Sequence, residues 1–451
     1  MEKSKAAVSE EKKGGRRKTS KGLFSYPYYL LFMAVCNLMR LYFGIRVNKS
    51  RAFREQKKNG AMLVLSNHVS SLDFAYFTPP FWGRKISYVV AENMMYSTPL
   101  FAKVIKGYHA ITKKQFYADF TCIKNIRKYL DAGISVVLCP EGKVSAEGKT
   151  GPVAVSVAKL VKWLGYPVAS SVIKGGGLLR PKWAYTSRKG GAQCDMDIMM
   201  TAEEVAAKSI PEIMEVINSA LAHNEHVWQR ENGVKVRGKR YAEGLERLLY
   251  KCPSCGAEFT MRTKGDTIYC AHCGAAAKYS GTGEILPYGR DAGAYPARID
   301  LWYDEEKRDM EKRVREEGFS LTSPVHLFLE NADRNGYRYA ASGTLTLDKD
   351  SLTFVCSTKT RPKNAVSKYK ISAMDYDLAS ADGEREPVEE ELRLIKFPVR
   401  NFVTVANIPG DSLDLYDEKH TYRMMFAKEK ASTQFVLAIE AMNGLKTAAK
   451  V

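Results

Sequence analysis

A histidine and a carboxylate stand close together in LVLSNHVSSLDF, residues 63–74. An apolar run that predicts a buried strand ends here, Asn67 and His68 follow it, and Asp73 stands five positions after the histidine. Five residues on a regular helix turn the chain by about 500°, so the two side chains can meet only if the strand passes into a helix between them. A carboxylate against an imidazole fixes its tautomer and makes it a better general base. The alternative is a histidine that only caps a turn.

A second predicted strand end carries an acid. The buried run in VVLCPEGKVS, residues 136–145, stops at Pro140 and presents Glu141 and Gly142. Sites in open α/β sheets gather beyond the C-terminal ends of the strands, so His68 and Glu141 are expected at one edge. The alternative for Glu141 is a surface turn residue.

Basic residues beside predicted strand ends could hold a phosphate through charge-assisted contacts. These residues are Lys113, Lys114, Arg180 and Lys182. Each by itself could equally be a solvated surface charge. The segment 142–150 also contains Gly-Lys-Thr, but a nucleotide-binding loop needs a glycine where Lys143 stands. We therefore exclude an NTPase.

Four of the nine cysteines form two C-x2-C pairs within residues 252–274. They are Cys252, Cys255, Cys270 and Cys273. Four thiolates at this spacing predict a tetrahedral structural zinc in a zinc ribbon, and metal would stabilise a segment too short to fold on its own core. Redox dithiols are the alternative, and His272 is expected to be a bystander. No open coordination position is evident, so we assign this metal no catalytic role.

The composition allows a large globular protein with an anionic partner. A chain of 451 residues predicts two to four domains. It is 45% hydrophobic and 26% charged, which is ordinary, but its formal charge is +19. Such a charge suits nucleic acid, an anionic bilayer, or acidic or phosphorylated substrates. The five scattered cysteines suit a reducing compartment.

The N-terminal part predicts membrane association. Residues 1–22 carry eight Lys/Arg against three Glu, typical of a disordered basic tail. Residues 23–39 are uncharged, and Arg40 ends the run before the roughly 20 residues that a spanning helix needs. We expect residues 23–60 to hold a helix embedded in or lying on the membrane, with the tail at the anionic cytoplasmic face. A buried core helix is the alternative.

Residues 61–246 predict an α/β domain with a mostly parallel sheet, because strands and helices alternate. The predicted strands are residues 61–66, 86–90, 133–139, 167–173 and 194–200. The predicted helices are residues 114–131, 153–164 and 201–228, the last interrupted near Pro211.

Three units follow along the chain. The zinc ribbon occupies residues 247–290, and residues 291–322 form a charged linker whose helix, 301–318, is expected to be solvated. Residues 323–451 predict a β-rich roll of short strands closed by a helix over 431–445. This last unit resembles a pleckstrin-homology or GRAM-like roll, which implies lipid-headgroup binding or packing against the ribbon.

Taken together, the motifs resemble the glycerolipid acyltransferase family, whose best-known members are lysophosphatidic acid (1-acylglycerol-3-phosphate) acyltransferases. Order and spacing fit over residues 61–230. The matching motifs are His68-x4-Asp73, Pro140-Glu141-Gly142, the segment from Gly107 to Lys113, and Pro167-Val168.

The resemblance implies a membrane-associated O-acyltransferase. His68 would take the proton from an acceptor hydroxyl and Asp73 would orient it, while the hydroxyl attacks a thioester of coenzyme A or acyl carrier protein. The chain has no Gly-x-Ser-x-Gly motif, in keeping with direct attack. The expected acceptor is a lysophospholipid, first of all lysophosphatidic acid, which gives phosphatidic acid. The implied substrate-binding residues are Asn67, Lys113, Glu141, Gly142, Lys143 and Arg180.

Departures from the family pattern leave alternatives open. Lys113 replaces an arginine, Lys143-Val144 replaces Thr-Arg, and Ser170 replaces a second proline. Another lipid alcohol could therefore be the acceptor. A non-catalytic zinc-ribbon binding or scaffold protein is the alternative outside the enzymes. No aromatic-and-basic ladder accompanies the ribbon, so no nucleic-acid partner is expected.

Overall fold

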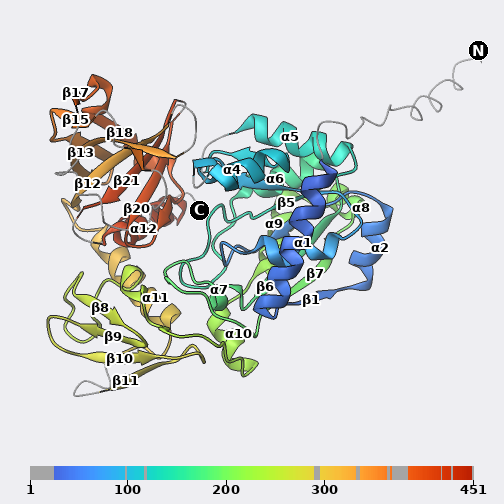
Figure 1. The fold of residues 1–451 in the computed structure, drawn as a ribbon, viewed down its shortest axis with the longest axis horizontal. Helices are drawn as coiled ribbons and strands as arrows, with labels where there is room; N and C mark the ends of the chain where they lie inside the picture. Colours follow the sequence, from blue (N-terminus) through green and yellow to red (C-terminus); the bar gives the residue numbers. More distant parts are fainter. Residues whose placement is uncertain are drawn as a thin grey trace, which may run out of the picture.

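The chain folds into an α/β domain, a small β-ribbon and a curled C-terminal sheet. Figure 1, a computed structural model, shows them at the right, lower left and upper left. The expected basic tail, residues 1–22, lies outside the described residues. The structure describes residues 25–96, 99–115, 119–288, 295–331, 336–362, 366–367, 384–417, 419–427 and 430–448.

Seven strands form the sheet of the α/β domain. In spatial order they are β1 (Arg46–Lys49), β7 (Gln193–Met200), β6 (Val168–Lys174), β2 (Leu63–Ser66), β5 (Ser135–Leu138), β3 (Ile86–Ala91) and β4 (Ile111–Lys113). Only β6 and β7 pair antiparallel; the other neighbours are parallel. The predicted mostly parallel sheet is confirmed. The sequence missed β1 and β4, which are too short to show a pattern.

Helices cover both faces of this sheet. They are α1 (Tyr26–Phe43), α2 (Arg51–Asn59), α3 (Phe74–Phe77), α4 (Pro99–Gly107), α5 (Phe120–Asp131), α6 (Val155–Leu164), α7 (Gly176–Leu179), α8 (Ala202–Ala207), α9 (Ile210–Leu221) and α10 (Glu225–Glu231). Side chains of β2 alternate between the faces. Leu63 and Leu65 pack in one cluster with Ile217 of α9. Val64 packs in another with Met33 of α1. Burial on both faces explains the continuous apolar strands.

The helix predicted over residues 201–228 does break near Pro211, as expected, but it also ends at Leu221, so its continuation to residue 228 is wrong. Three helices replace it, because each start is capped. Thr201 and Ser209 each form a reciprocal capping box with the glutamate three residues on. The Asn224 side chain accepts from the N–H groups that begin α10. Capping of this kind satisfies the free donors of a helix start and fixes where each helix begins.

One side of helix α1 is buried, and its other side is apolar and exposed. Its Phe32 ring packs 5.1–5.8 Å from the rings of Phe74, Tyr88 and Tyr108. The alternative of a buried core helix describes one side of α1 only, since the other side carries exposed apolar residues. These are Leu30, Leu31, Val35, Leu38, Leu41 and Tyr42. Among the described helices, none combines the length and the apolar character needed to cross a bilayer.

The ribbon is a four-stranded antiparallel meander. Its strands are β8 (Met261–Lys264), β9 (Thr267–Cys270), β10 (Ala276–Tyr279) and β11 (Ile285–Tyr288). Helix α11 (Ile299–Arg313) follows.

The C-terminal unit, residues 321–448, is a curled antiparallel sheet that ends in a helix. Its order is β18 (Leu394–Pro398), β14 (Ser351–Cys356), β13 (Tyr337–Leu347), β12 (Leu321–Glu330), β21 (Thr421–Phe426), β20 (Ser412–Tyr416) and β19 (Ala406–Ile408). The remaining elements are β15 (Thr360–Pro362), β16 (Val366–Ser367), β17 (Arg385–Pro387) and α12 (Ser432–Ala448). The predicted roll with a terminal helix is confirmed. The sequence SKYKIS also predicts a strand at 367–372, which lies, after Ser367, outside the described residues.

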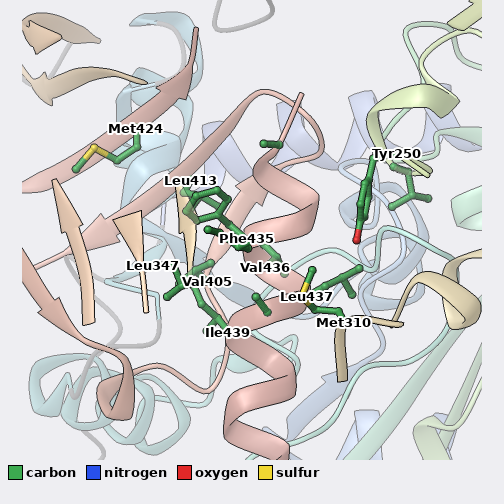
Figure 2. Close-up of a cluster of buried hydrophobic side chains, with 14 of the residues drawn as sticks. Tyr250, Met310, Leu347, Val405, Leu413, Met424, Phe435, Val436, Leu437 and Ile439 are labelled. Atoms are coloured by element: carbon green, nitrogen blue, oxygen red, sulfur yellow. The ribbon is translucent and has the colours of Figure 1, made fainter. Parts of the chain in front are cut away.

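The ribbon, α11 and the C-terminal unit share one hydrophobic core. Figure 2 shows Tyr250, from the segment before β8, in the same cluster as Met310 of α11, Leu413 of β20 and Phe435 of α12. The prediction that α11 is solvated is therefore wrong: its charged sequence carries an apolar stripe that includes Trp302, and this stripe is buried. Truncating Phe435 to Ala would cost about 3–5 kcal/mol of stability.

Candidate active site

His68 and Asp73 meet where β2 gives way to α3. The His68 Nδ1 atom lies 2.7 Å from Asp73 Oδ2, and the same oxygen accepts the Val69 N–H at 3.0 Å. Asp73 stands directly before α3, so the change from strand to helix brings the two side chains together. Burial raises the pKa of Asp73, and the hydrogen bond with His68 opposes that rise.

The imidazole can act as a general base. The His68 side chain is 26% exposed, while Asp73 is 3% exposed. If Nδ1–H donates to Asp73, Nε2 carries the free lone pair. Among the described residues, none forms a hydrogen bond with Nε2 of His68. The ring therefore has one nitrogen fixed by a buried carboxylate and the other available to a substrate hydroxyl.

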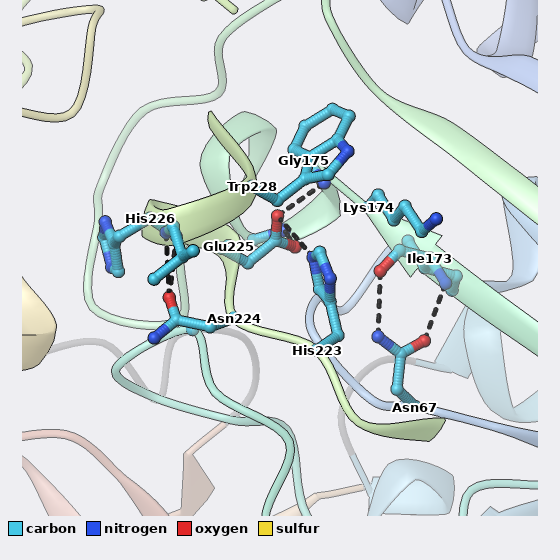
Figure 3. A network of polar contacts seen from close by, with 12 residues as sticks. Asn67, Ile173, Lys174, Gly175, His223, Asn224, Glu225, His226 and Trp228 are labelled. Carbon is cyan, nitrogen blue, oxygen red and sulfur yellow. Dashed lines mark hydrogen bonds and ion pairs between the residues drawn. The ribbon is translucent and has the colours of Figure 1, made fainter. Parts of the chain in front are cut away.

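Asn67, expected at the substrate, is engaged with the protein backbone instead. Its Nδ2 donates to the Ile173 carbonyl at 2.8 Å, and its Oδ1 accepts the Ile173 N–H at 2.7 Å (Figure 3). The side chain is fully buried. Asn67 thus ties the end of β2 to β6 and positions the residue that follows it.

Glu141, which was also expected at the substrate, forms hydrogen bonds with backbone N–H groups instead. One carboxylate oxygen accepts the His68 N–H at 2.8 Å, and the other accepts the Gly151 N–H at 2.7 Å. The Ser145 N–H donates back to the His68 carbonyl at 2.7 Å. Burial raises the pKa of Glu141 to about 8, against the lowering effect of its two backbone donors. The loop after β5 is therefore fastened to both the backbone N–H and the backbone carbonyl of His68.

Gly142 makes the turn that this arrangement needs. Its φ of +72° lies in the left-handed region that glycine adopts without strain. The Gly142 carbonyl accepts a hydrogen bond from Gln115 Nε2 at 2.5 Å. Gln115 was not singled out in the sequence, where it has no distinguishing pattern.

The predicted phosphate-binding side chains do not all converge. Lys113 Nζ donates to the Lys114 carbonyl at 3.2 Å, and Arg180 Nη1 donates to Ser187 Oγ at 2.7 Å. Lys143 donates instead to residues of the C-terminal unit, as described below.

A buried acid that sequence reasoning missed shapes the loop after β6. Glu225 accepts the backbone N–H groups of Gly175 and Gly177, and His223 Nε2 lies 3.3 Å from it (Figure 3). Gly175 has a φ of +80°, and a Cβ there would meet the Gly191 carbonyl oxygen at 2.8 Å. Glu225 thus satisfies the donors of a glycine turn beside β2. No sequence pattern ties residue 225 to residue 175.

The four cysteines of the ribbon lie together. Their sulfur atoms are all within 4.8 Å of one another. Cys252 and Cys273 are 3.8 Å apart, and Cys255 and Cys270 are 3.9 Å apart. Four thiolates about 2.3 Å from a tetrahedral zinc would be about 3.8 Å apart, so the donor set fits that ion. The glycine after each pair, Gly256 and Gly274, has φ near +75°, which turns both knuckles toward the centre.

Residues 44–174 match the family model described as Acyltransferase. No curated protein matches the chain. Among solved structures, the chain is similar to the 1-acyl-sn-glycerophosphate (LPA) acyltransferase PlsC from Thermotoga maritima, with 15% identity over 43% of this chain and 76% of that one, at a TM-score of 0.37. The segment that holds His68, Asp73 and Glu141 is thus the part of the chain that the acyltransferase family model describes.

Proposed function

We propose that this protein is a membrane-associated O-acyltransferase that moves an acyl chain from a thioester to a lysophospholipid hydroxyl. The observation that carries the proposal is the 2.7 Å contact between His68 Nδ1 and Asp73 Oδ2 inside the segment that matches acyltransferases. The first acceptor to test is lysophosphatidic acid, which would give phosphatidic acid.

The proposed reaction uses the His68–Asp73 pair, the thioester donor and the acceptor hydroxyl. His68 Nε2 takes the proton of the acceptor hydroxyl as its oxygen attacks the thioester carbonyl, and Asp73 stabilises the imidazolium that forms. The carbon–sulfur bond breaks, and the thiolate leaves with the proton that His68 returns. Base catalysis of this kind contributes about 10²–10⁴-fold to the rate. Asn67 and Glu141, which hold the backbone on either side, keep the ring in place.

The exposed face of α1 is the proposed membrane contact. Leu30, Leu38 and Leu41 are among the apolar side chains on that face. Removing one leucine side chain from water contributes about 1.5–3 kcal/mol, so several together would hold a helix at a bilayer surface. The net charge of +19 adds attraction to an anionic surface. An enzyme docked in this way would meet lysophospholipid in the leaflet.

The ribbon is proposed to hold one structural zinc. Cys252, Cys255, Cys270 and Cys273 would be its four ligands, which leaves no position for substrate. The metal would stabilise the ribbon and, through the shared core, the C-terminal unit. No step of the reaction uses it.

A transfer assay with two donors and several acceptors tests the proposal. Purified protein is mixed with anionic vesicles and a radiolabelled acyl donor, either acyl-coenzyme A or the acyl thioester of acyl carrier protein. The acceptor is lysophosphatidic acid, another lysophospholipid or another lipid alcohol. Labelled phosphatidic acid is the expected product. Product only from another acceptor would correct the acceptor. No product in any combination would favour the scaffold alternative.

A further inference from the structure

The C-terminal unit covers the edge of the sheet where the candidate active site lies. Asn93, just after β3, donates to Asp414 of β20 at 2.8 Å. Lys114, just after β4, donates to the Asp417 carbonyl at 2.9 Å. An apolar cluster joins the same two parts: Met95, Ala102, Ile105, Phe328, Tyr337 and Tyr339. Loops after two parallel strands are thus bound by one unit, which the family match does not include.

The loop after β5 meets the same unit through a charged contact. Lys143 donates to the Glu440 carboxylate of α12 and, at 2.8 Å, to the Thr404 hydroxyl. Thr404 itself donates to Glu440 at 2.5 Å. Burial raises the pKa of Glu440, but the Lys143 ammonium, the Thr404 hydroxyl and the Lys307 charge together lower that pKa overall. Glu440 is therefore ionised at neutral pH.

A second lysine lies beside this pair. Lys182 donates to the Val144 carbonyl and to Asn407 Oδ1, both at 3.1 Å. Burial and the neighbouring Lys143 charge lower the pKa of Lys182 to about 7. Lys143 and Lys182 are half-buried beside Glu440. The Glu147 carboxyl, whose pKa burial raises, belongs to the same group of charges. A group with two negative charges would neutralise both amines, which the single charge of Glu440 does not.

This site adjoins the candidate base. The Ser145 N–H, two residues beyond Lys143, donates to the His68 carbonyl at 2.7 Å. Lys143 thus belongs to the loop that Glu141 fastens to His68, and Lys182 contacts the same loop through the Val144 carbonyl. A phosphate bound there would hold an acceptor on the His68 side of the sheet edge.

We propose that the Glu440 carboxylate occupies the place of the acceptor's phosphate, so that the acceptor must displace this contact of α12 to bind Lys143 and Lys182. This inference rests on the proposed function and adds to it a regulatory role for the C-terminal unit. The C-terminal unit then lowers the affinity for anionic acceptors, because the acceptor's phosphate must displace the Glu440 carboxylate from the lysines. A neutral acceptor, which has no phosphate, gains nothing from removal of the Glu440 charge.

The test is Glu440→Gln, which removes the charge and keeps the shape. Asp350→Asn, on the exposed turn between β13 and β14, removes one negative charge from the same unit and is the matched control. Binding of sn-glycerol 3-phosphate to the full chain is measured by calorimetry, and KM for lysophosphatidic acid and for monoacylglycerol is measured on vesicles. We expect Glu440→Gln to lower Kd and the lysophosphatidic acid KM by about 5-fold or more. The monoacylglycerol KM and the control variant stay at wild-type values.

The outcomes separate this inference from the proposed function. Equal Kd in wild type and Glu440→Gln, or no measurable binding by either, overturns the competition, whether or not the protein is an enzyme. An equal gain for monoacylglycerol also overturns it, since the effect would then not be electrostatic. Tighter binding by Glu440→Gln without acyl transfer by any variant would support the anion site and refute the proposed function.

Discussion

Glu141 accepts a hydrogen bond from the backbone N–H of His68 at 2.8 Å, so a carboxylate from the end of β5 holds the main chain of the candidate base at the end of β2. Its second oxygen holds Gly151. The acid that sequence motifs place at the substrate is therefore buried behind the histidine. Its effect on catalysis would come from the position of His68.

The pH dependence of stability tests this burial. The pKa of Glu141 is raised from 4.5 to about 8 in the folded protein. Folding therefore favours the protonated form of Glu141. The stability that this preference contributes is fully present below pH 4.5 and is lost as the pH rises through 8. Glu141→Gln mimics the protonated form. The free energy of unfolding of wild type minus that of Glu141→Gln should fall by up to several kcal/mol between these pH values. Urea titrations at each pH check this, and parallel curves would refute the raised pKa.

Asp73→Asn should reduce turnover far more than substrate binding. An amide cannot stabilise the imidazolium and favours the wrong tautomer of His68, so kcat should fall by about 100-fold or more with little change in KM. Steady-state kinetics measure both. Asp197→Asn, an exposed acid on β7, is the control and should match wild type. A loss confined to KM would mean that Asp73 acts on binding instead.

Metal analysis tests the ribbon. We expect one zinc per chain by mass spectrometry, and loss of that zinc in Cys270→Ser. Because the ribbon shares its core with α11 and the C-terminal unit, the variant should melt at least about 5 °C lower. Cys356→Ser, a cysteine outside the cluster, should keep its zinc. A metal-free wild type with a disulfide would favour the redox alternative.

Vesicle binding tests the exposed side of α1. Leu38 is 66% exposed, and Leu38→Glu should reduce co-sedimentation with anionic vesicles by about 10-fold or more, because a charge replaces an apolar contact. Leu394→Glu changes a leucine of similar exposure, 63%, in the C-terminal unit. Equal binding by both variants and wild type would remove α1 as the membrane contact.

Local patterns predicted much of the fold. Apolar runs identified five strands of the α/β sheet, and the spacing of His68 and Asp73 required the strand-to-helix turn that the structure contains. The capping residues Thr201, Ser209 and Asn224 were the signal that would have indicated three separate helix starts within residues 201–228. The many charged residues of α11 led to the prediction of a solvated helix. Trp302 is buried because the ribbon and the C-terminal unit supply the core around it.

The roles of the polar residues could not be obtained in the same way. Asn67 bonds to Ile173, 106 positions away, and Lys143 bonds to Glu440, 297 positions away. Motif position says that such residues lie near a site, but only the tertiary partner decides whether a side chain faces substrate or protein. The backbone role of Asn67 and the capture of Lys143 by α12 therefore required the structure.

The most direct measurement compares acyl transfer by wild type and His68→Ala on lysophosphatidic acid, with labelled acyl-coenzyme A and acyl carrier protein as donors. His420→Ala is the control, since that histidine lies in the C-terminal unit and is 29% exposed, close to the 26% of His68. We predict that wild type and the control form phosphatidic acid, and that His68→Ala is slower by about 100-fold or more while keeping its melting temperature. Equal rates in His68→Ala and wild type would contradict the assignment of His68 as the catalytic base.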